Sequence, residues 1–218
     1  MVKLFLNQQS PLEMNRMARH LHPKLKNSLK RFHGDRRGIA ALEFALIAPI
    51  LLTALFGMYE LDQAIIAQRS VNHIAATVGD LTAQAAFVGD SDVSDMFAVG
   101  NYMLSPLPSD SLSMRITSIY MTTAKVAKVD WSKSSGAGLP AIASGTVFAT
   151  NGLGTYNIPS GYLIKAGDSV ILSESQYNFN SPLQFVLNNA IKMSSSYIYR
   201  PRINSCVLYT PETACPTN

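Results

Sequence analysis

Residues 39–59 form an uninterrupted apolar run, IAALEFALIAPILLTALFGMY, in which Glu43 is the only charged residue. As an α-helix rising about 1.5 Å per residue, this run measures roughly 31 Å, which matches the hydrocarbon thickness of a bilayer. The sequence therefore predicts one transmembrane segment. The rest of the 218-residue chain is long enough for one ordinary domain.

The basic residues are concentrated in front of this run. Residues 1–37 hold nine Lys or Arg against two acids, a net charge of +7, whereas the rest of the chain holds nine against twelve, a net charge of −3. A nucleic-acid-binding domain spreads its basic residues over a folded face, so this distribution argues against a nucleic-acid partner. The positive-inside rule predicts a cytoplasmic N-terminus and an exported chain after residue 59.

Two simpler membrane signals compete for the same residues. A cleaved signal peptide has a shorter apolar region, of about 7 to 15 residues. An uncleaved anchor fits the length and charge, but it has no use for Glu43, because a carboxylate at mid-membrane costs about 2.5–3.5 kcal/mol. A Glu43 that snorkels toward the headgroups as an ordinary flanking charge stays open as the plain alternative.

The residues around Glu43 carry a motif. An RRG step ending at Gly38 comes directly before IAALEF. Here the chain resembles the type IV prepilins, which have a basic leader ending in Gly, a cut before a hydrophobic residue, and Glu then an aromatic residue at mature positions five and six. Gly38, Ile39, Glu43 and Phe44 match these elements.

The wider segment more narrowly resembles the TadE-like pseudopilins of the tight-adherence (Flp) pilus. Their segment has a Pro six residues after the Glu, and Gly then Glu at its far end, where this chain has Pro49, Gly57 and Glu60. The tail resembles the family more loosely, at Trp131, Ser132, Tyr177, Phe179, Pro182 and Arg200 to Arg202. The 38-residue leader is long for the family, so Met14 and Met17 are alternative starts, and the first mature residue is Ile rather than the common Phe.

The resemblance implies a processing and assembly mechanism. A prepilin peptidase would cut after Gly38, remove the basic leader 1–38 and expose an α-amino group on Ile39. Glu43 of an entering subunit would pair with that amine on its neighbour, and the pairing would fix the register. Pro49 cannot donate to the preceding turn and would kink or loosen the helix, with or without a function. The implied partners are the peptidase, other pilin or pseudopilin subunits, an inner-membrane assembly platform and membrane lipid.

Beyond the membrane segment, the expected fold is α+β and type IV pilin-like, with a periplasmic helix half at 60–88 and a globular domain at 89–218. One helix is predicted from residue 37 to 88, with apolar residues on one face at Val71, Ile74, Val78, Leu81 and Ala85. A short second helix from Asp90 would turn Val93, Met96 and Phe97 inward. Its acids suit N-capping better than calcium binding.

Alternating apolar residues then predict a small antiparallel sheet of three to five strands. The candidate strands are 111–120, 125–131, 168–179 and 196–209, with a long loop within 132–164. Leu112, Met114 and Ile116 alternate in the first strand, and residues 127, 129 and 131 in the second. Pro201 cannot donate to a ladder, so the last strand should lie at an edge or break there.

The remaining motifs favour a structural role for the exported part. Cys206 and Cys215, the only cysteines, predict a disulfide in an oxidising compartment, whereas a zinc site lacks nearby histidines. Asp130, Ser132 and Ser134 fit the D-x-S-x-S pattern of von Willebrand type A domains, but the following Gly- and Pro-rich stretch does not suit that fold.

Catalytic motifs such as H-E-x-x-H, a P-loop or G-x-S-x-G are not found in the sequence, so we expect neither an enzyme nor a cofactor. The predicted function is that of a minor TadE-like pseudopilin of the bacterial inner membrane, acting in pilus biogenesis, surface attachment and biofilm formation. The alternative is an uncleaved, signal-anchored periplasmic binding or adhesion module with a ligand surface at Trp131, Tyr156, Tyr162 and Tyr177.

Overall fold

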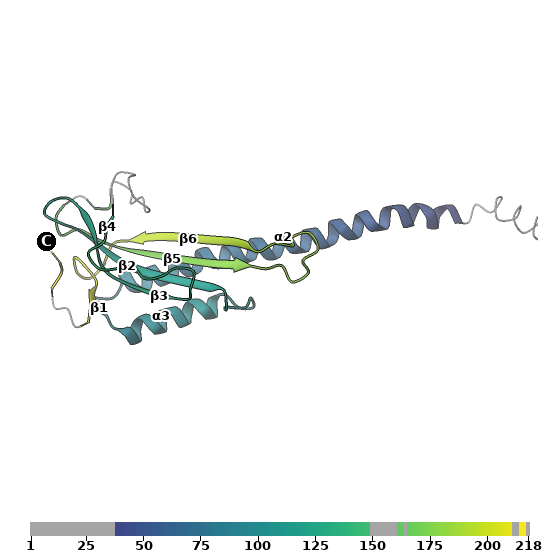
Figure 1. Ribbon diagram of the computed structural model, residues 1–218. Helices are drawn as coiled ribbons and strands as arrows, with labels where there is room; N and C mark the ends of the chain where they lie inside the picture. The colour runs from purple at the N-terminus through teal and green to yellow at the C-terminus, as the bar shows by residue number, and fades with distance from the viewer. Residues whose placement is uncertain (1–37, 149–160, 164, 211–213, 217–218) are drawn as a thin grey trace, which may run out of the picture. The chain divides into compact units, whose positions relative to one another are not determined.

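The computed structural model describes residues 38–148, 161–163, 165–210 and 214–216 (Figure 1). The predicted leader therefore lies outside the described residues except for Gly38. The chain divides into two compact units, Met1–Ala54 and Leu55–Asn218. In chain order the elements are α2 (Ile39–Ala83), β1 (Phe87–Val88), α3 (Asp90–Met103), β2 (Leu112–Met121), β3 (Ala127–Ser135), β4 (Val147–Phe148), β5 (Ser169–Phe179), β6 (Ile191–Tyr199) and β7 (Leu208–Tyr209).

In the first unit, residues 39–54 belong to α2, and all of them except the half-buried Ala48 are exposed. The helix is apolar on all sides here, with Leu42, Phe44 and Leu46 each about two-thirds exposed. A helix that is apolar all round needs an apolar environment from outside.

In the second unit, α2 packs one face into the domain core. Val71, Ile74 and Val78 are fully buried, as the periodicity predicts. The expected continuation through Leu81 is wrong: this side chain is 38% exposed, and Thr82, four residues after Val78, is buried in its place. The i+4 position repeats the face of Val78 more closely than the i+3 position does.

α2 ends at Ala83 rather than at the predicted residue 88. Phe87–Val88 forms strand β1 and pairs in parallel with β7. The Ala83 carbonyl, which has no partner within the helix, accepts a hydrogen bond from the Arg202 N–H at 2.9 Å. The helix thus stops without a breaker because extended pairing buries Val88 completely, which the local sequence does not reveal.

α3 is longer than predicted and spans Asp90–Met103. The Gly89 N–H donates to the Asp92 carboxylate at 2.8 Å, so an acid caps this helix as expected. Val93 and Phe97 are buried and Met96 is partly buried, which confirms the predicted inward face.

The main sheet has five antiparallel strands in the order β4-β3-β2-β5-β6, within the predicted range. β2 and β5 lie within one residue of the predicted strands 111–120 and 168–179. β3 begins two residues after the predicted residue 125 and extends to Ser135. The predicted long loop is interrupted by the two-residue edge strand β4.

A bulge in β3 separates residues that strict alternation places on one face. Ile119 pairs with Val129 but Thr117 pairs with Ser132, so two β3 residues oppose Ser118 alone. The predicted common face of Val129 and Trp131 is therefore wrong. The two side chains belong to different core clusters.

The last predicted strand, 196–209, is two strands. β6 starts earlier, at Ile191, lies at the sheet edge and ends at Tyr199, two residues before Pro201. This confirms the expected effect of Pro201. The chain then forms β7, which pairs with β1 in a separate two-stranded parallel sheet.

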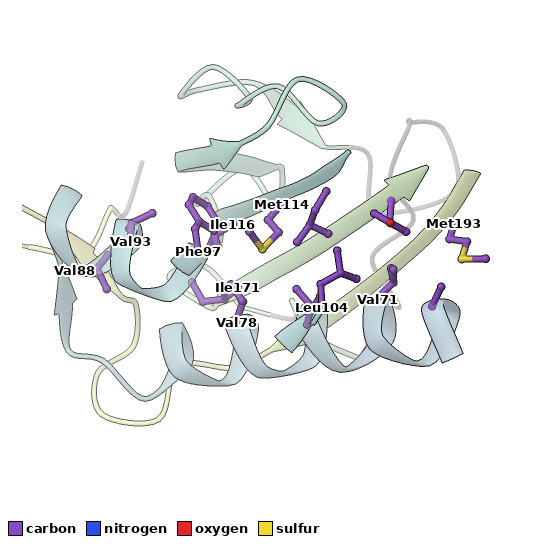
Figure 2. Close-up of a cluster of buried hydrophobic side chains, with 14 of the residues drawn as sticks. Val71, Val78, Val88, Val93, Phe97, Leu104, Met114, Ile116, Ile171 and Met193 are labelled. Carbon is purple, nitrogen blue, oxygen red and sulfur yellow. The ribbon is translucent and has the colours of Figure 1, made fainter. Parts of the chain in front are cut away.

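The main core lies between the two helices and one face of the sheet. Figure 2 shows Val71 and Val78 of α2 with Phe97 of α3 beside Met114 and Ile116 of β2, and all five side chains are buried. The structure is thus α+β, with the long N-terminal helix packed through its second half on an antiparallel sheet, as predicted for a pilin-like chain.

The opposite face of the sheet has its own core and a buried ion pair. Ile119 and Val170 belong to a second apolar cluster there. On the same face, the Arg115 guanidinium contacts the Glu174 carboxylate at 2.7 Å and donates to the Pro140 carbonyl at 2.8 Å. Both charged side chains are nearly inaccessible to water, so the loop that contains Pro140 covers this face.

Candidate functional site

Among the described residues, α2 is the one helix long and apolar enough to cross a membrane. None of the most apolar stretch is buried within the structure. Length, composition and exposure of this stretch therefore agree with the predicted membrane anchor at 39–59.

The predicted processing site lies where α2 begins. Gly38 comes directly before the helix, and Ile39 is its first residue and is 50% exposed. A Cβ atom added to Gly38 meets nothing within 4 Å. Replacement of this glycine by alanine is therefore compatible with the fold, which makes Gly38 a clean position at which to test recognition by a peptidase.

The predicted assembly residues lie on the exposed first part of α2. Glu43 is exposed one helical turn after Ile39, and Phe44 is 69% exposed. α2 continues through the exposed Pro49, whose carbonyl accepts a hydrogen bond from the Thr53 hydroxyl at 2.7 Å. These side chains are thus available to other molecules.

Glu60, the first residue after the apolar run, is a buried acid with several hydrogen-bond donors. Its side chain is completely buried, and the carboxylate accepts hydrogen bonds from three successive backbone N–H groups. These donors are Phe185 at 2.7 Å, Val186 at 2.8 Å and Leu187 at 2.7 Å, in the loop that joins β5 to β6. Glu60 therefore fastens this loop to α2.

The hydrogen bonds set the charge state of Glu60. Burial raises the pKa of this carboxyl group, but the N–H groups of Leu187, Phe185 and Val186 and the Ser181 side chain lower it more strongly, to a pKa of about 2. A carboxylate that accepts several backbone hydrogen bonds is favoured in its charged form. Glu60 is thus an anion over the whole physiological pH range.

Gly57, one turn before Glu60, lets the loop approach the helix. A Cβ atom at this position would lie 3.3 Å from Cγ2 of Val186, closer than an ordinary van der Waals contact. The Phe56 and Phe185 rings meet edge to face beside it, with centroids 5.6 Å apart. Gly57 and Glu60 therefore act on the same loop: Gly57 leaves room for it, and Glu60 binds its backbone.

Sequence analysis placed Glu60 in the TadE-like motif but predicted no structural role for it. Two signals point to it in retrospect: it is the second acid of an otherwise apolar stretch, and Gly57 stands one turn before it. The three N–H donors lie more than 120 residues later, so their identity depends on the tertiary structure.

The C-terminal part of the chain is held by the predicted disulfide and by two arginines. Cys206 and Cys215 are bonded to each other. The Arg200 guanidinium donates to the carbonyls of Gly161 and Tyr162, at 2.7 and 3.0 Å. Arg202 forms an ion pair with Asp80 of α2. These contacts tie the segment after β6 to α2 and to the preceding loop.

Two of the four residues proposed as a ligand surface for a binding module are buried. Trp131 and Tyr177 are 5% and 2% exposed and belong to the core, and the Trp131 indole N–H donates to the Val207 carbonyl at 2.8 Å. Tyr162 is half-buried, and Tyr156 lies outside the described residues.

The D-x-S-x-S residues lie within strand β3. The Ser132 hydroxyl is 3.0 Å from Oγ1 of Thr117 on the neighbouring strand. In the part of the chain that the structure describes, no group of three or more His, Cys, Asp or Glu could hold a metal ion.

The comparisons with known proteins concern the first part of the chain. Residues 38–79 match the family model described as TadE-like protein. No curated protein and no solved structure matches the chain. The matched segment starts at Gly38, includes Glu43, Pro49 and Glu60, and ends before the sheet. Residues 38–79 are therefore similar to TadE-like proteins.

Proposed function

We propose that this protein is a minor pseudopilin of a tight-adherence (Flp, type IVc) pilus, processed by a prepilin peptidase between Gly38 and Ile39. The observation that carries the proposal is the TadE-like match, which begins at Gly38, directly before the predicted cut, and includes Glu43. A leader that ends where the family segment starts is a natural unit to remove.

Removal of the leader changes the charge at the membrane surface. It takes away the +7 block and creates an α-amino group on Ile39, whose usual pKa of about 7.7–8.0 leaves it mostly cationic at neutral pH. Glu43, on the exposed helix surface, is costly in lipid while it is unpaired. The new amine of a neighbouring subunit neutralises it, and a wrong register leaves both charges unpaired.

The proposed topology follows from the same charges. The N-terminus is cytoplasmic, residues 39–59 span the inner membrane, and residues 60–218 lie in the periplasm before the subunit joins the surface pilus. The Cys206–Cys215 disulfide suits that oxidising compartment. The partners are the prepilin peptidase, other pilin or pseudopilin subunits, the inner-membrane assembly platform and lipid. The subunit contributes to pilus biogenesis and hence to surface attachment and biofilm formation.

The processing step is tested with glycine variants. Wild-type protein, Gly38→Ala and Gly161→Ala are expressed with the prepilin peptidase of a tight-adherence system and analysed by intact mass. Gly161 is the matched control, because a Cβ atom there also meets nothing within 4 Å. We expect the wild type and Gly161→Ala, but not Gly38→Ala, to lose residues 1–38. The same outcome in all three proteins, whether residues 1–38 are kept or lost, would refute the proposed cut.

The assembly step is tested with Glu43→Gln and, as control, Asp62→Asn. Both acids are exposed on α2, but Asp62 follows the apolar run. We expect both variants to be processed, and only Glu43→Gln to be missing from sheared pili in cells that produce the other subunits. Normal incorporation of Glu43→Gln would contradict the pairing mechanism and favour an ordinary flanking charge.

The uncleaved binding or adhesion module receives less support. Its proposed ligand surface relied on Trp131 and Tyr177, which are core residues. In that alternative, the native protein keeps its leader, and Glu43→Gln has no effect on the surface pilus.

A further inference from the structure

The loop between β5 and β6, residues 180–190, carries no charged residue and exposes three large apolar side chains. No charged residue occurs between Glu174 and Lys192. Leu183, Phe185 and Val186 are 48%, 56% and 49% exposed. Three large apolar side chains on one short loop form a surface that water does not favour.

The contacts with α2 fix the depth of this loop relative to the membrane segment. Glu60, which binds the loop backbone, is the first residue after the apolar run 39–59. Phe185 and Val186 contact residues still inside that run, Phe56 and Gly57. At about 1.5 Å per residue, these contacts lie roughly 3–5 Å below the end of the run.

α2 also exposes apolar side chains near the end of the membrane segment. Met58, Leu61 and Ile65 are 72%, 55% and 52% exposed. Lys and Arg are absent from α2 until Arg69. Apolar side chains are thus exposed on α2 as well as on the loop near the end of the membrane segment.

Glu60 also provides hydrogen-bond acceptors for backbone N–H groups of the loop, which would otherwise be costly to place in lipid. Backbone N–H groups without partners are costly in an apolar medium, so irregular segments normally stay out of it. Here the N–H groups of Phe185, Val186 and Leu187, in the most apolar part of the loop, all donate to the Glu60 carboxylate. The side chains can enter lipid while these donors stay satisfied.

We propose that the loop 180–190 inserts Leu183, Phe185 and Val186 into the interfacial region of the phospholipid bilayer, as a second membrane contact beside the transmembrane helix. Phospholipid is favoured over a protein partner because the contacts with Phe56 and Gly57 hold the loop at membrane depth in every inserted subunit, before any assembly. The inference rests on membrane insertion of residues 39–59 and does not depend on processing or on a role in the pilus.

The test uses the full chain in vesicles of phosphatidylethanolamine and phosphatidylglycerol, with an environment-sensitive fluorophore on one added cysteine. Leu183→Cys carries the probe on the loop. Ile203→Cys is the matched control: Ile203 is an exposed apolar residue, 62% accessible, and its neighbour Arg202 binds Ala83. Ala83 lies 23 residues beyond Glu60, about 35 Å along the helix.

We expect the probe at 183, and not at 203, to shift to shorter emission wavelength and to be quenched several-fold more by phospholipid carrying a nitroxide near the headgroup. Iodide in the water should quench mainly the probe at 203. Equal iodide quenching at both positions would overturn the proposal. A shift at 183 that disappears on dilution with lipid would also overturn it and would identify a contact between subunits.

Two further variants separate the parts of the argument. A probe on Ile47→Cys shows whether residues 39–59 are in the membrane. If this probe is also in water, the predicted membrane segment is wrong and the proposal about the loop fails with it. Processing at Gly38 is measured independently. In the Leu183→Cys background, Glu60→Gln should move the probe toward water, whereas Asp62→Asn should not. An unchanged probe depth in Glu60→Gln would overturn the role of Glu60 in holding the loop.

Discussion

Replacement of Gly79 by alanine tests how closely α2 packs on the sheet. Gly79 is a buried residue of α2. A Cβ atom there would lie 2.7 Å from Cδ2 and Cε2 of the Tyr199 ring on β6 and 2.8 Å from Cβ of Ser173 on β5. The ring of Tyr199 can turn aside, but Cβ of Ser173 is attached directly to the strand backbone. Helix and sheet must therefore move apart locally.

The expected change in the free energy of unfolding of Gly79→Ala is the sum of two opposing effects. Alanine is favoured over glycine inside a helix by about 1 kcal/mol. Overpacking of a tight core costs about 1–3 kcal/mol. The sum is a loss of about 1 kcal/mol in the free energy of unfolding, or a thermal midpoint lower by about 2–4 °C for a domain of this size.

The assay is thermal unfolding of the full chain in detergent micelles, followed by circular dichroism, with Gly161→Ala as control. The control position is open, so its midpoint should stay the same or rise slightly. A midpoint of Gly79→Ala that rises by the amount expected from helix propensity alone would refute the close contact between α2 and the sheet.

Two further predictions concern stability. The Cys206–Cys215 disulfide closes a loop with a sequence separation of nine, so its reduction should lower the free energy of unfolding by about 2.5 kcal/mol. Urea titration with and without reductant measures this difference. No change would mean that the segment around β7 adds nothing to global stability. Glu60 has a pKa of about 2 in the folded protein against an ordinary 4.5, so its stabilising effect should be complete above pH 4.5 and lost as the pH falls through about 2. Hydrogen-exchange protection of the amides of residues 185–187, compared with Glu60→Gln, should show the same pH dependence. Protection that is already lost at pH 5 would contradict the assigned hydrogen bonds.

The sequence was sufficient wherever one strong local pattern decides the structure. The apolar run and its isolated Glu43 predicted the exposed helix, and clean alternation in β2 and β5 predicted two central strands to within a residue. Pro201 marked the end of β6 because no neighbouring strand can replace its missing N–H group. In each case the signal lies within a few consecutive residues.

The structure differs from the sequence-based predictions where contacts with residues far away in the sequence determine the conformation. α2 stops at Ala83 because Val88 is better buried in a strand that pairs with β7, some 120 residues later. The β3 bulge sends Trp131 to the helix side, where the indole finds the Val207 carbonyl. Glu60 likewise became a structural residue only through the donors of a distant loop. Local periodicity contains no information about these partners.

The N-terminal residue of the protein isolated from cells that assemble the pilus is the most direct test of the proposed function. Intact mass and terminal sequencing should give a chain that begins at Ile39, with a free α-amino group opposite Glu43 of a neighbouring subunit. A native protein that still begins before Arg36, with its basic leader attached, would contradict the proposed processing and the charge pairing that depends on it.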